Sequence, residues 1–373
     1  MTSEELSRET YQRLGDERND WRWQMRNRIS TVSHLRKWIR LDANETEAIE
    51  RCRGLYRWTV TPYYADLMDP DSPACPIRRQ AVPGLVEFQD LPDSEADPVG
   101  DRDFRRTNRV IHKYPDRAIL LVTQLCPVYC RHCTRKYHTS AYGSSYFETG
   151  EAENFTEDFD YIRSHSEIRD VLLTGGDPLT YGDERLRAIL RELRAIEHVE
   201  IIRVGTRYPV LLPQRITLDF CRMLEAFHPV WLNTHFNHPK EVTAEAAAAC
   251  DRLLRHGVPV QNQTVLLRDI NDDDATFKDL LRQLLRIRVR PYYLYHCDNV
   301  RGVSGFATTI ERGRELMDAV SGYMTGFAVP TYVLTTKLGK IPLHAHQFEM
   351  HEDRVWIQNY AGEHAVLPNV WKT

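Results

Sequence analysis

Residues 120–137 read LLVTQLCPVYCRHCTRKY, and this stretch decides the fold. The apolar run at 118–123 has the length and composition of a buried strand. Cys126, Cys130 and Cys133 follow directly in the loop after it. In a barrel of alternating strands and helices, the loop after a strand lies on the C-terminal face, where active sites form. We therefore expect this cysteine loop to line an active site.

Alternating strand and helix patterns continue from residue 109 to about residue 330. Repeated strand–helix units give a parallel sheet with right-handed crossovers. A full eight-unit barrel needs about 250 residues, more than this region has, so we predict an α/β fold with a partial (β/α)6 barrel. The expected strands are 118–123, 170–174, 199–205, 230–235, 258–266 and 290–295. The expected helices are 157–165, 183–197, 216–227, 242–256, 272–288 and 309–322.

The regions on either side of the barrel have different patterns. Residues 1–108 read as a helical region that ends in a long loop rich in Pro and Asp, from 69 to 105. A loop of this length usually carries a function or wraps a partner subunit. Residues 331–373 return to short strand patterns, so we expect a C-terminal β-containing segment. The chain thus divides into 1–108, 109–330 and 331–373.

The three clustered cysteines point to an iron–sulfur centre. Three thiolates at this spacing can hold three irons of a 4Fe–4S cluster, and the fourth iron then stays open for a ligand such as S-adenosylmethionine (SAM). The alternatives are a structural zinc site, for which His132 would be the fourth ligand, and inert buried thiols. Gly175, Gly176 and Asp177 follow the next strand, where glycines allow a close backbone approach to a ligand.

Several collinear motifs resemble one family, the lysine 2,3-aminomutases, which are radical SAM enzymes. The resemblance runs from about residue 19 to about residue 360. The motifs are NDWRWQMRNRI at 19–29, PYYADLMDP at 62–70, CRHCTR at 130–135, DVLLTGGDPL at 170–179, LPQRIT at 212–217, HPVWLNTHFNHP at 228–239, RVRPYYLYHCD at 288–298 and VPTYV at 329–333.

The resemblance implies three cofactors: the 4Fe–4S cluster on Cys126, Cys130 and Cys133, SAM, and pyridoxal 5′-phosphate (PLP). In TTKLGKIPL at 335–343, Lys340 matches the lysine that binds PLP, with Lys337 as the alternative. Eight further residues match cofactor-binding positions. They are Lys113, Tyr114 and Arg117 near the PLP phosphate; Gly175, Gly176 and Asp177 near SAM; and His235 and Gln263 near SAM or PLP.

Substrate recognition is implied at three positions. Arg135 matches the arginine that pairs with the substrate α-carboxylate, a geometry suited to a guanidinium fork. Lysine-specific relatives place two aspartates against the substrate ammonium; here the two positions hold Asp298 and Thr335. The combination favours a cationic amino acid, lysine or arginine, with a neutral amide as the alternative.

The implied activity is that of an isomerase that moves the α-amino group of an L-amino acid to C3 and gives a β-amino acid. Two other activities stay open: deamination or dehydration through the same C3 radical, and a lysine aminomutase that acts in elongation factor P modification. A third alternative is a non-catalytic iron–sulfur regulator. The reaction needs an external one-electron reductant such as flavodoxin or ferredoxin, and the family resemblance implies a homo-oligomer.

Composition bears on partners and location. Acidic and basic residues nearly balance, with a net charge of -4 over 373 residues, which argues against nucleic acid or membrane binding. The N-terminus has no apolar signal segment and the apolar runs are short, so we expect a cytoplasmic protein. We expect no structural zinc, because the cysteine-rich tail of clostridial relatives is missing and Asp273 lies near their partner-cysteine position. His344 and His346 are a weaker candidate metal pair in a strand.

Overall fold

The computed structural model describes residues 6–142, 154–343, 348–351, 354–358 and 362–368. Nine strands form one sheet in the order β1 to β9. The strands from β2 to β8 pair in parallel, and β1 and β9 add antiparallel strands at the two edges. The strands are β1 (Val110–Tyr114), β2 (Arg117–Thr123), β3 (Asp170–Gly175), β4 (Ile201–Gly205), β5 (Val230–Thr234), β6 (Val260–Leu266), β7 (Arg290–His296), β8 (Thr331–Thr336) and β9 (Gly339–Pro342).

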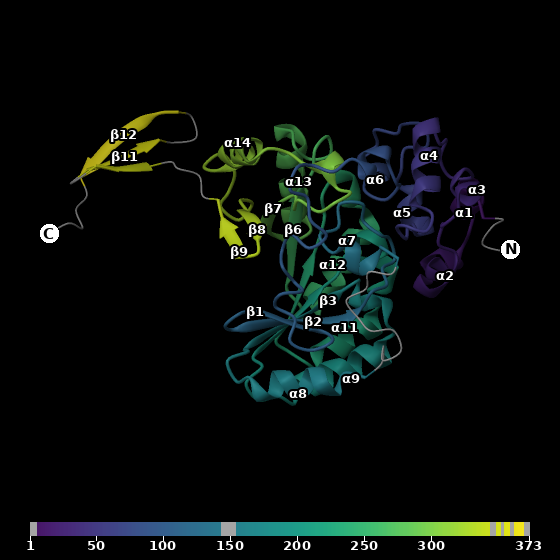
Figure 1. Cartoon of the computed structure of the whole chain (residues 1–373), viewed down its shortest axis with the longest axis horizontal. Helices are drawn as coiled ribbons and strands as arrows, with labels where there is room; N and C mark the ends of the chain where they lie inside the picture. The colour runs from purple at the N-terminus through teal and green to yellow at the C-terminus, as the bar shows by residue number, and fades with distance from the viewer. Residues whose placement is uncertain (1–5, 143–153, 344–347, 352–353, 359–361, 369–373) are drawn as a thin grey trace.

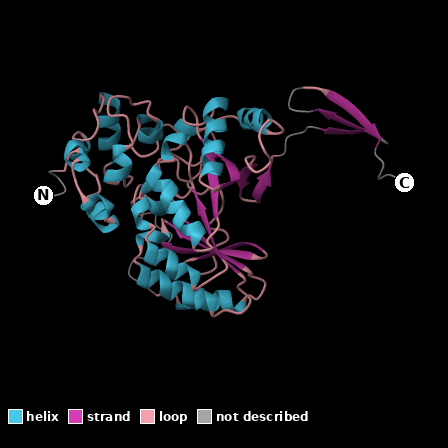
Figure 2. Cartoon of the chain, turned by 180° about the vertical axis from the view of Figure 1, so that it is seen from behind, coloured by secondary structure: helices cyan, strands magenta, loops and turns pink. Residues whose placement is uncertain are grey.

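Helices follow the strands and cover the outer face of the curved sheet (Figure 2). This arrangement confirms the expected partial barrel, and each expected strand and helix lies within a few residues of its predicted position. The main helices are α8 (Thr156–Ser164), α9 (Asp183–Arg194), α11 (Leu218–Glu225), α12 (Ala244–Arg255), α13 (Asp274–Arg286) and α14 (Ile310–Val320). Short helices α7 (Lys136–Thr139) and α10 (Tyr208–Leu211) lie in the loops after β2 and β4.

Local sequence signals set the starts of these helices. The side chain of Asp273 accepts a hydrogen bond from the backbone of Thr276 and caps α13. Threonines play the same part before α11, α12 and α14. Such caps satisfy backbone donors that have no partner inside the helix. Each of these caps lies at the end of the loop that follows a strand and marks the start of the next helix.

The sheet has three strands beyond the six expected in the barrel. Residues 331–336, expected in the C-terminal segment, form β8, which pairs in parallel with β7 and continues the barrel. The turn into β9 then brings Lys340 back along β8. The edge strand β1 was not expected. The structure therefore places the PLP-lysine candidate on the sheet itself.

The N-terminal region packs against the barrel, at the purple and blue end in Figure 1. Its contacts are polar as well as apolar: the hydroxyl of Thr61 donates to the carbonyl of Leu211 at 2.7 Å, and the hydroxyl of Tyr64 donates to Glu241 at 2.7 Å. Its helices are α1 (Arg8–Gln12), α2 (Trp21–Arg26), α3 (Val32–Leu35), α4 (Ala43–Cys52), α5 (Pro62–Asp66) and α6 (Pro76–Arg79), with the 3-10 helix η2 at Leu85–Phe88.

The Pro- and Asp-rich loop lies along the barrel of its own chain. Glu95 exchanges backbone hydrogen bonds with Asn299 and Arg301, in the loop after β7. Farther along, Asp101 is buried and reaches the cysteine loop. The loop thus lies along one side of the barrel mouth.

A second sheet of three antiparallel strands stands apart from the barrel in both ribbon views (Figures 1 and 2). It contains β10 (Phe348–His351), β11 (Arg354–Gln358) and β12 (His364–Pro368). These strands lie within residues 331–373, where short strands were expected. His344 and His346 lie outside the described residues.

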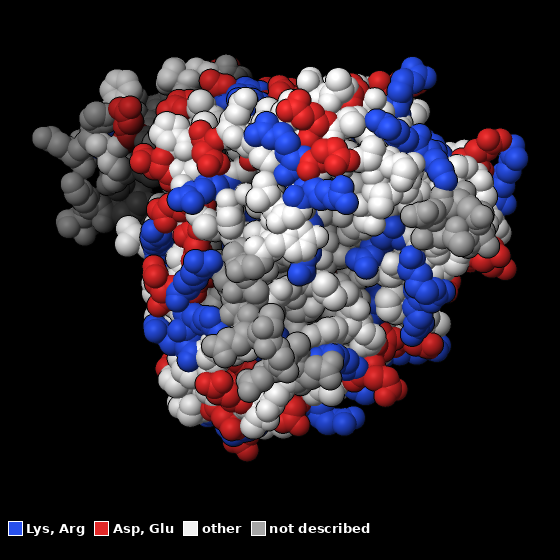
Figure 3. Space-filling model, turned by 45° about the vertical axis from the view of Figure 1, so that its right-hand side comes forward, with Lys and Arg blue, Asp and Glu red and all other residues white. Residues whose placement is uncertain are grey.

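Acidic and basic side chains are interspersed over the face shown in Figure 3, without a large area of one sign. No helix in the described ranges is long and apolar enough to cross a membrane.

Candidate active site

One cavity of about 310 Å³ opens at the C-terminal ends of the strands. Every site residue expected from the sequence lines it, from the cysteine loop at one side to the β8–β9 turn at the other. These residues are Lys113, Tyr114, Arg117, Cys126, Cys130, Cys133, Arg135, Gly175, Gly176, Asp177, His235, Gln263, Asp298, Thr335 and Lys340.

The cysteine loop is anchored by buried charges. Glu87, fully buried on η2, bonds to Arg131 and to Lys136, whose ammonium lies 2.6 Å from the carboxylate. The two cations hold the pKa of Glu87 at about 2, even though burial alone would raise it. This ion-pair cluster connects the N-terminal region to both sides of Cys133. Breaking such a pair would leave an uncompensated buried charge, so the loop is held firmly.

The three clustered cysteines are free thiols facing the cavity. Burial raises the pKa of Cys126 and Cys133. Buried thiolates of this kind need a metal to hold them in the charged form. Among the described residues, no three His, Cys, Asp or Glu side chains converge on one point that could hold a single metal ion. A cubane cluster does not require such convergence, because each cysteine binds a different iron. The donor set fits a 4Fe–4S cluster.

The two glycines after β3 allow the chain to cross the cysteine loop closely. Gly175 has φ of +123°, and a Cβ there would lie 2.5 Å from the carbonyl oxygen of Thr123. A Cβ on Gly176 would lie 2.4 Å from the carbonyl oxygen of Leu125. The backbone of Gly176 donates to Thr123 and that of Asp177 donates to Leu125. The glycines therefore fix the cysteine loop on the sheet, in addition to any contact with a ligand.

We expect Gly176→Ala to destabilise the chain by about 3 kcal/mol and to lower the iron content after reconstitution, because the new methyl group would overlap backbone atoms. Thermal unfolding and iron analysis measure the two effects. Gly182→Ala is the matched control, since nothing lies within 4 Å of a Cβ at Gly182. Equal unfolding temperatures for the two variants would contradict the expectation.

Asp177 joins the loops after β3 and β4. Its carboxylate accepts hydrogen bonds from the backbone of Leu179 at 3.1 Å, the hydroxyl of Thr206 at 2.7 Å and the backbone of Arg207 at 2.7 Å. Burial raises its pKa to about 6. Both oxygens thus have protein donors, and the side chain positions the segments that surround the cysteines.

Lys340 lies in the cavity at the start of β9. Its backbone donates to the hydroxyl of Tyr114 at 2.9 Å, and its ammonium lies 5.1 Å from the ring centres of Tyr293 and Tyr295. Burial, followed by the nearby charges of Arg203 and Arg117, lowers the pKa of Lys340 to about 7. Near neutral pH, a large fraction of this amine is therefore uncharged and nucleophilic.

The alternative lysine has a different environment. Lys337 is half exposed, pairs with Glu95 at 2.6 Å and does not line the cavity. The hydrogen bond to Glu95 raises its pKa, which keeps it protonated. These observations favour Lys340 over Lys337 as the PLP lysine.

Cationic side chains gather near Lys340. Arg117 and Arg203 line the cavity, and Arg203 bonds to Asp170 at 2.8 Å. Lys113 also lines it, but its ammonium donates to the carbonyls of Val99 and Thr336 and so ties the long loop to β8. Arg203 was not among the expected residues. A charged residue inside the apolar run IIRVG was the signal that could have pointed to it.

The substrate-binding candidates meet on the side of the long loop. Arg135 donates to Asp101 at 2.7 Å, and Asp101 was not among the expected site residues. Asp298 accepts from the hydroxyl of Thr134 at 2.5 Å through one oxygen, and its Oδ1 is buried without a partner among the described residues. Burial raises the pKa of Asp298 to about 6. An unpartnered, buried carboxylate oxygen facing a cavity is a natural acceptor for a ligand donor.

The remaining candidates lie at strand ends. Thr335 pairs with Lys340 across β8 and β9, so the two residues face the same side of the sheet. Gln263, on β6, and His235, just after β5, also line the cavity. Burial lowers the pKa of His235 to about 4, which keeps the imidazole neutral.

Together, the open parallel barrel and the loop of three cysteines at its mouth define a radical SAM enzyme, and the Radical SAM superfamily matches residues 120–281. The L-lysine 2,3-aminomutase of Fusobacterium nucleatum is 43% identical over 93% of this chain and 81% of its own length. The chain belongs to the lysine 2,3-aminomutase family, whose members are isomerases. Membership implies a 4Fe–4S cluster, SAM and PLP.

Two further relatives show that overall sequence similarity does not identify the substrate. The L-lysine 2,3-aminomutase of Clostridium subterminale is 43% identical over 92% of this chain and 82% of its own length. The glutamate 2,3-aminomutase of Clostridioides difficile is 42% identical over 87% of this chain and 76% of its own length. Because the lysine and glutamate enzymes are nearly equally similar, the substrate has to be argued from the cavity.

Proposed function

We propose that this chain is a PLP-dependent radical SAM 2,3-aminomutase that moves the α-amino group of a cationic L-amino acid, lysine first, to C3. The observation that carries the proposal is that one cavity holds both the three-cysteine loop and the buried Lys340. A SAM-derived radical and a PLP-bound substrate must meet in one space. A single cavity lined by both the cysteines and Lys340 can bring them together.

The chemistry of the bound groups sets what the residues must do. When bound, SAM on the cluster supplies a radical that takes hydrogen from C3, and PLP carries the migrating nitrogen. Cys126, Cys130 and Cys133 hold the cluster at one side of the cavity. Lys340 holds PLP beside the rings of Tyr293 and Tyr295, whose centres lie 5.1 Å from its ammonium.

The charged residues orient the ligands between these two sides. Arg117 and Arg203 provide positive charge beside Lys340 for an anionic phosphate. Arg135 offers a guanidinium to the α-carboxylate of the substrate. The hydrogen bond from its Nε to the carboxylate of Asp101, at 2.7 Å, fixes the orientation of the guanidinium. Fixed geometry of this kind is the main contribution that a protein makes to cofactor-borne radical chemistry.

The preference for a cationic side chain rests on Asp298. Its buried Oδ1 has no hydrogen-bond partner within the described ranges, and a substrate ammonium or guanidinium in the cavity would give it one. A glutamate substrate would place a second carboxylate beside it, and like charges at such a site repel. Thr335 places a neutral hydroxyl at the position where the sequence resemblance implies a second aspartate in lysine-specific relatives.

The test is incubation of the anaerobically reconstituted chain with PLP, SAM, dithionite and a mixture of L-amino acids, followed by chiral mass spectrometry. We expect loss of lysine or arginine and gain of the isomeric β-amino acid. Loss of ammonia or water would instead establish a deaminase or dehydratase. Formation of (R)-β-lysine would favour the role in elongation factor P modification. Conversion of glutamate alone would overturn the cationic substrate.

We also propose that the chain draws its electron from an external one-electron donor such as flavodoxin or ferredoxin, and that it works as a homo-oligomer. Titration with reduced flavodoxin and sedimentation analysis test the two points.

A further inference from the structure

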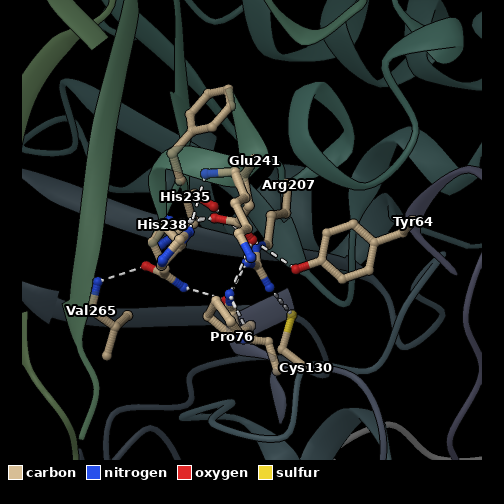
Figure 4. A network of polar contacts seen from close by, with 12 residues as sticks. Tyr64, Pro76, Cys130, Arg207, His235, His238, Glu241 and Val265 are labelled. Atoms are coloured by element: carbon tan, nitrogen blue, oxygen red, sulfur yellow. Dashed lines mark hydrogen bonds and ion pairs between the residues drawn. The ribbon is translucent and has the colours of Figure 1, made fainter. Parts of the chain in front are cut away.

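Arg207, in the loop after β4, is buried against the cysteine loop (Figure 4). Each nitrogen of its guanidinium donates to a defined acceptor. Nε donates to the carbonyl of His235 at 2.9 Å, and one terminal nitrogen donates to Cys130 Sγ at 2.9 Å. The other terminal nitrogen donates to Gln80 at 2.5 Å and to Glu241 at 2.7 Å.

Glu241, at the end of the 3-10 helix η5 (Pro239–Glu241), keeps the guanidinium in place. It is fully buried, and its Oε1 also accepts from Tyr64 at 2.7 Å. Its Oε2 accepts from the backbone of Asn237 at 2.6 Å and of His238 at 3.0 Å. Because both carboxylate oxygens are held from several sides, Arg207 cannot turn away from Cys130 without leaving buried groups unpaired.

We propose that Arg207 is a positioning residue that fixes Cys130 and raises the reduction potential of the cluster held by the three cysteines. One electron from an external donor turns the oxidised cluster into the reduced one and adds negative charge to the cysteine sulfurs. A charged donor 2.9 Å from one of these sulfurs stabilises the reduced form more than the oxidised form. Hydrogen bonds to ligand sulfurs are a general means by which proteins tune such clusters.

Another buried arginine provides a contrast in the same loop. Arg131 lies between two cluster cysteines in the sequence, but it bonds to Glu87 and its terminal nitrogen lies 3.8 Å from Cys52, outside the cluster motif. Arg131 thus anchors the loop through an ion pair. In Arg207, by contrast, the ion pair occupies one terminal nitrogen and the other is directed at Cys130 Sγ. Arg131→Lys is therefore the matched control, because it disturbs a buried ion pair in the loop without removing a donor to a cluster cysteine.

The test compares the wild-type chain with Arg207→Gln, Arg207→Lys and Arg131→Lys after anaerobic reconstitution, with iron and sulfide assayed first. A dithionite titration monitored by electron paramagnetic resonance then gives the potential. We expect Arg207→Gln to lower the ratio of reduced to oxidised cluster at least tenfold, about 59 mV for one electron. Arg207→Lys keeps the charge, so its cluster should have a reduction potential between those of Arg207→Gln and the wild type. The potential of Arg131→Lys should match that of the wild type. Loaded Arg207 variants with the wild-type potential would overturn the proposal.

A second measurement uses the unaltered chain, in case the Arg207 variants do not fold. Wild-type protein labelled with ¹⁵N-arginine should show a weak ¹⁵N coupling to the reduced cluster by pulsed resonance. Absence of that coupling would overturn the contact with Cys130. The inference rests on the cysteine ligands of the proposed function, but the inference and the proposed function can fail separately. Absence of a cluster in the wild type would overturn both. A cluster-loaded Arg207→Gln variant that has the wild-type reduction potential and still makes β-amino acid would overturn this inference alone.

Discussion

Replacing Lys340 with alanine should lower formation of the β-amino acid by at least about 10³-fold, because the amine that captures PLP is then absent. PLP retained after gel filtration, measured by visible absorption, should fall to the level of a non-binding protein. Lys340 lies on β9, whereas the three cysteines lie in the loop after β2, so the iron content of Lys340→Ala should equal that of the wild type.

Lys337→Ala is the control for this loss. It removes the same side chain three residues earlier, from an exposed position that pairs with Glu95 and lies outside the cavity. We expect nearly wild-type PLP retention and activity. If Lys337→Ala lost PLP while Lys340→Ala kept it, the assignment of the lysine would be reversed.

The same lysine sets a pH dependence. Its pKa is lowered to about 7, so the amine is mostly neutral above pH 7 and becomes protonated as the pH falls below that value. The rate of PLP capture by the cofactor-free chain should therefore level off above pH 7 and fall toward tenfold per unit below it. A stopped-flow pH profile measures this. An ordinary lysine would instead show a rate that still rises tenfold per unit between pH 7 and 9.

Asp298→Asn should lower kcat/KM for lysine by about 10²- to 10³-fold, as removing one partner of a buried charge pair costs about 2–5 kcal/mol. The change leaves the shape of the side chain but removes the negative charge whose Oδ1 has no partner in the described part of the chain. The kcat/KM for L-norleucine, which lacks the ammonium group, should fall much less. The measurement is the ratio of kcat/KM for lysine to kcat/KM for norleucine.

Asp279→Asn is the matched control, because it makes the same chemical change on α13, away from the cavity, where the carboxylate accepts from Gln283. It should leave both kcat/KM values near those of the wild type. An equal loss for lysine and norleucine in Asp298→Asn would mean that Asp298 supports the fold and does not select the substrate.

Much of the barrel could be predicted because its signals are local. Apolar runs of strand length and helical periodicity are properties of neighbouring residues, and they placed the expected strands and helices of the barrel. The strand β1 was missed because VIHKY alternates only partly, and its pairing with β2 depends on the tight turn at 115–116. The strand pattern of β8 was seen, but a pattern does not reveal its neighbour in the sheet.

By itself, the sequence determined the alternating fold, the three-cysteine loop and the lysine candidates, because each depends on residue type and short spacing. The tertiary structure decided which residues, distant in the sequence, lie next to each other. It brought Arg203 beside Lys340, Asp101 onto Arg135 and Arg207 onto Cys130, pairs that are separated by 34 to 137 positions along the chain. It also separated Lys340 from Lys337, since burial and charge, which set the pKa of an amine, arise only when distant segments pack together.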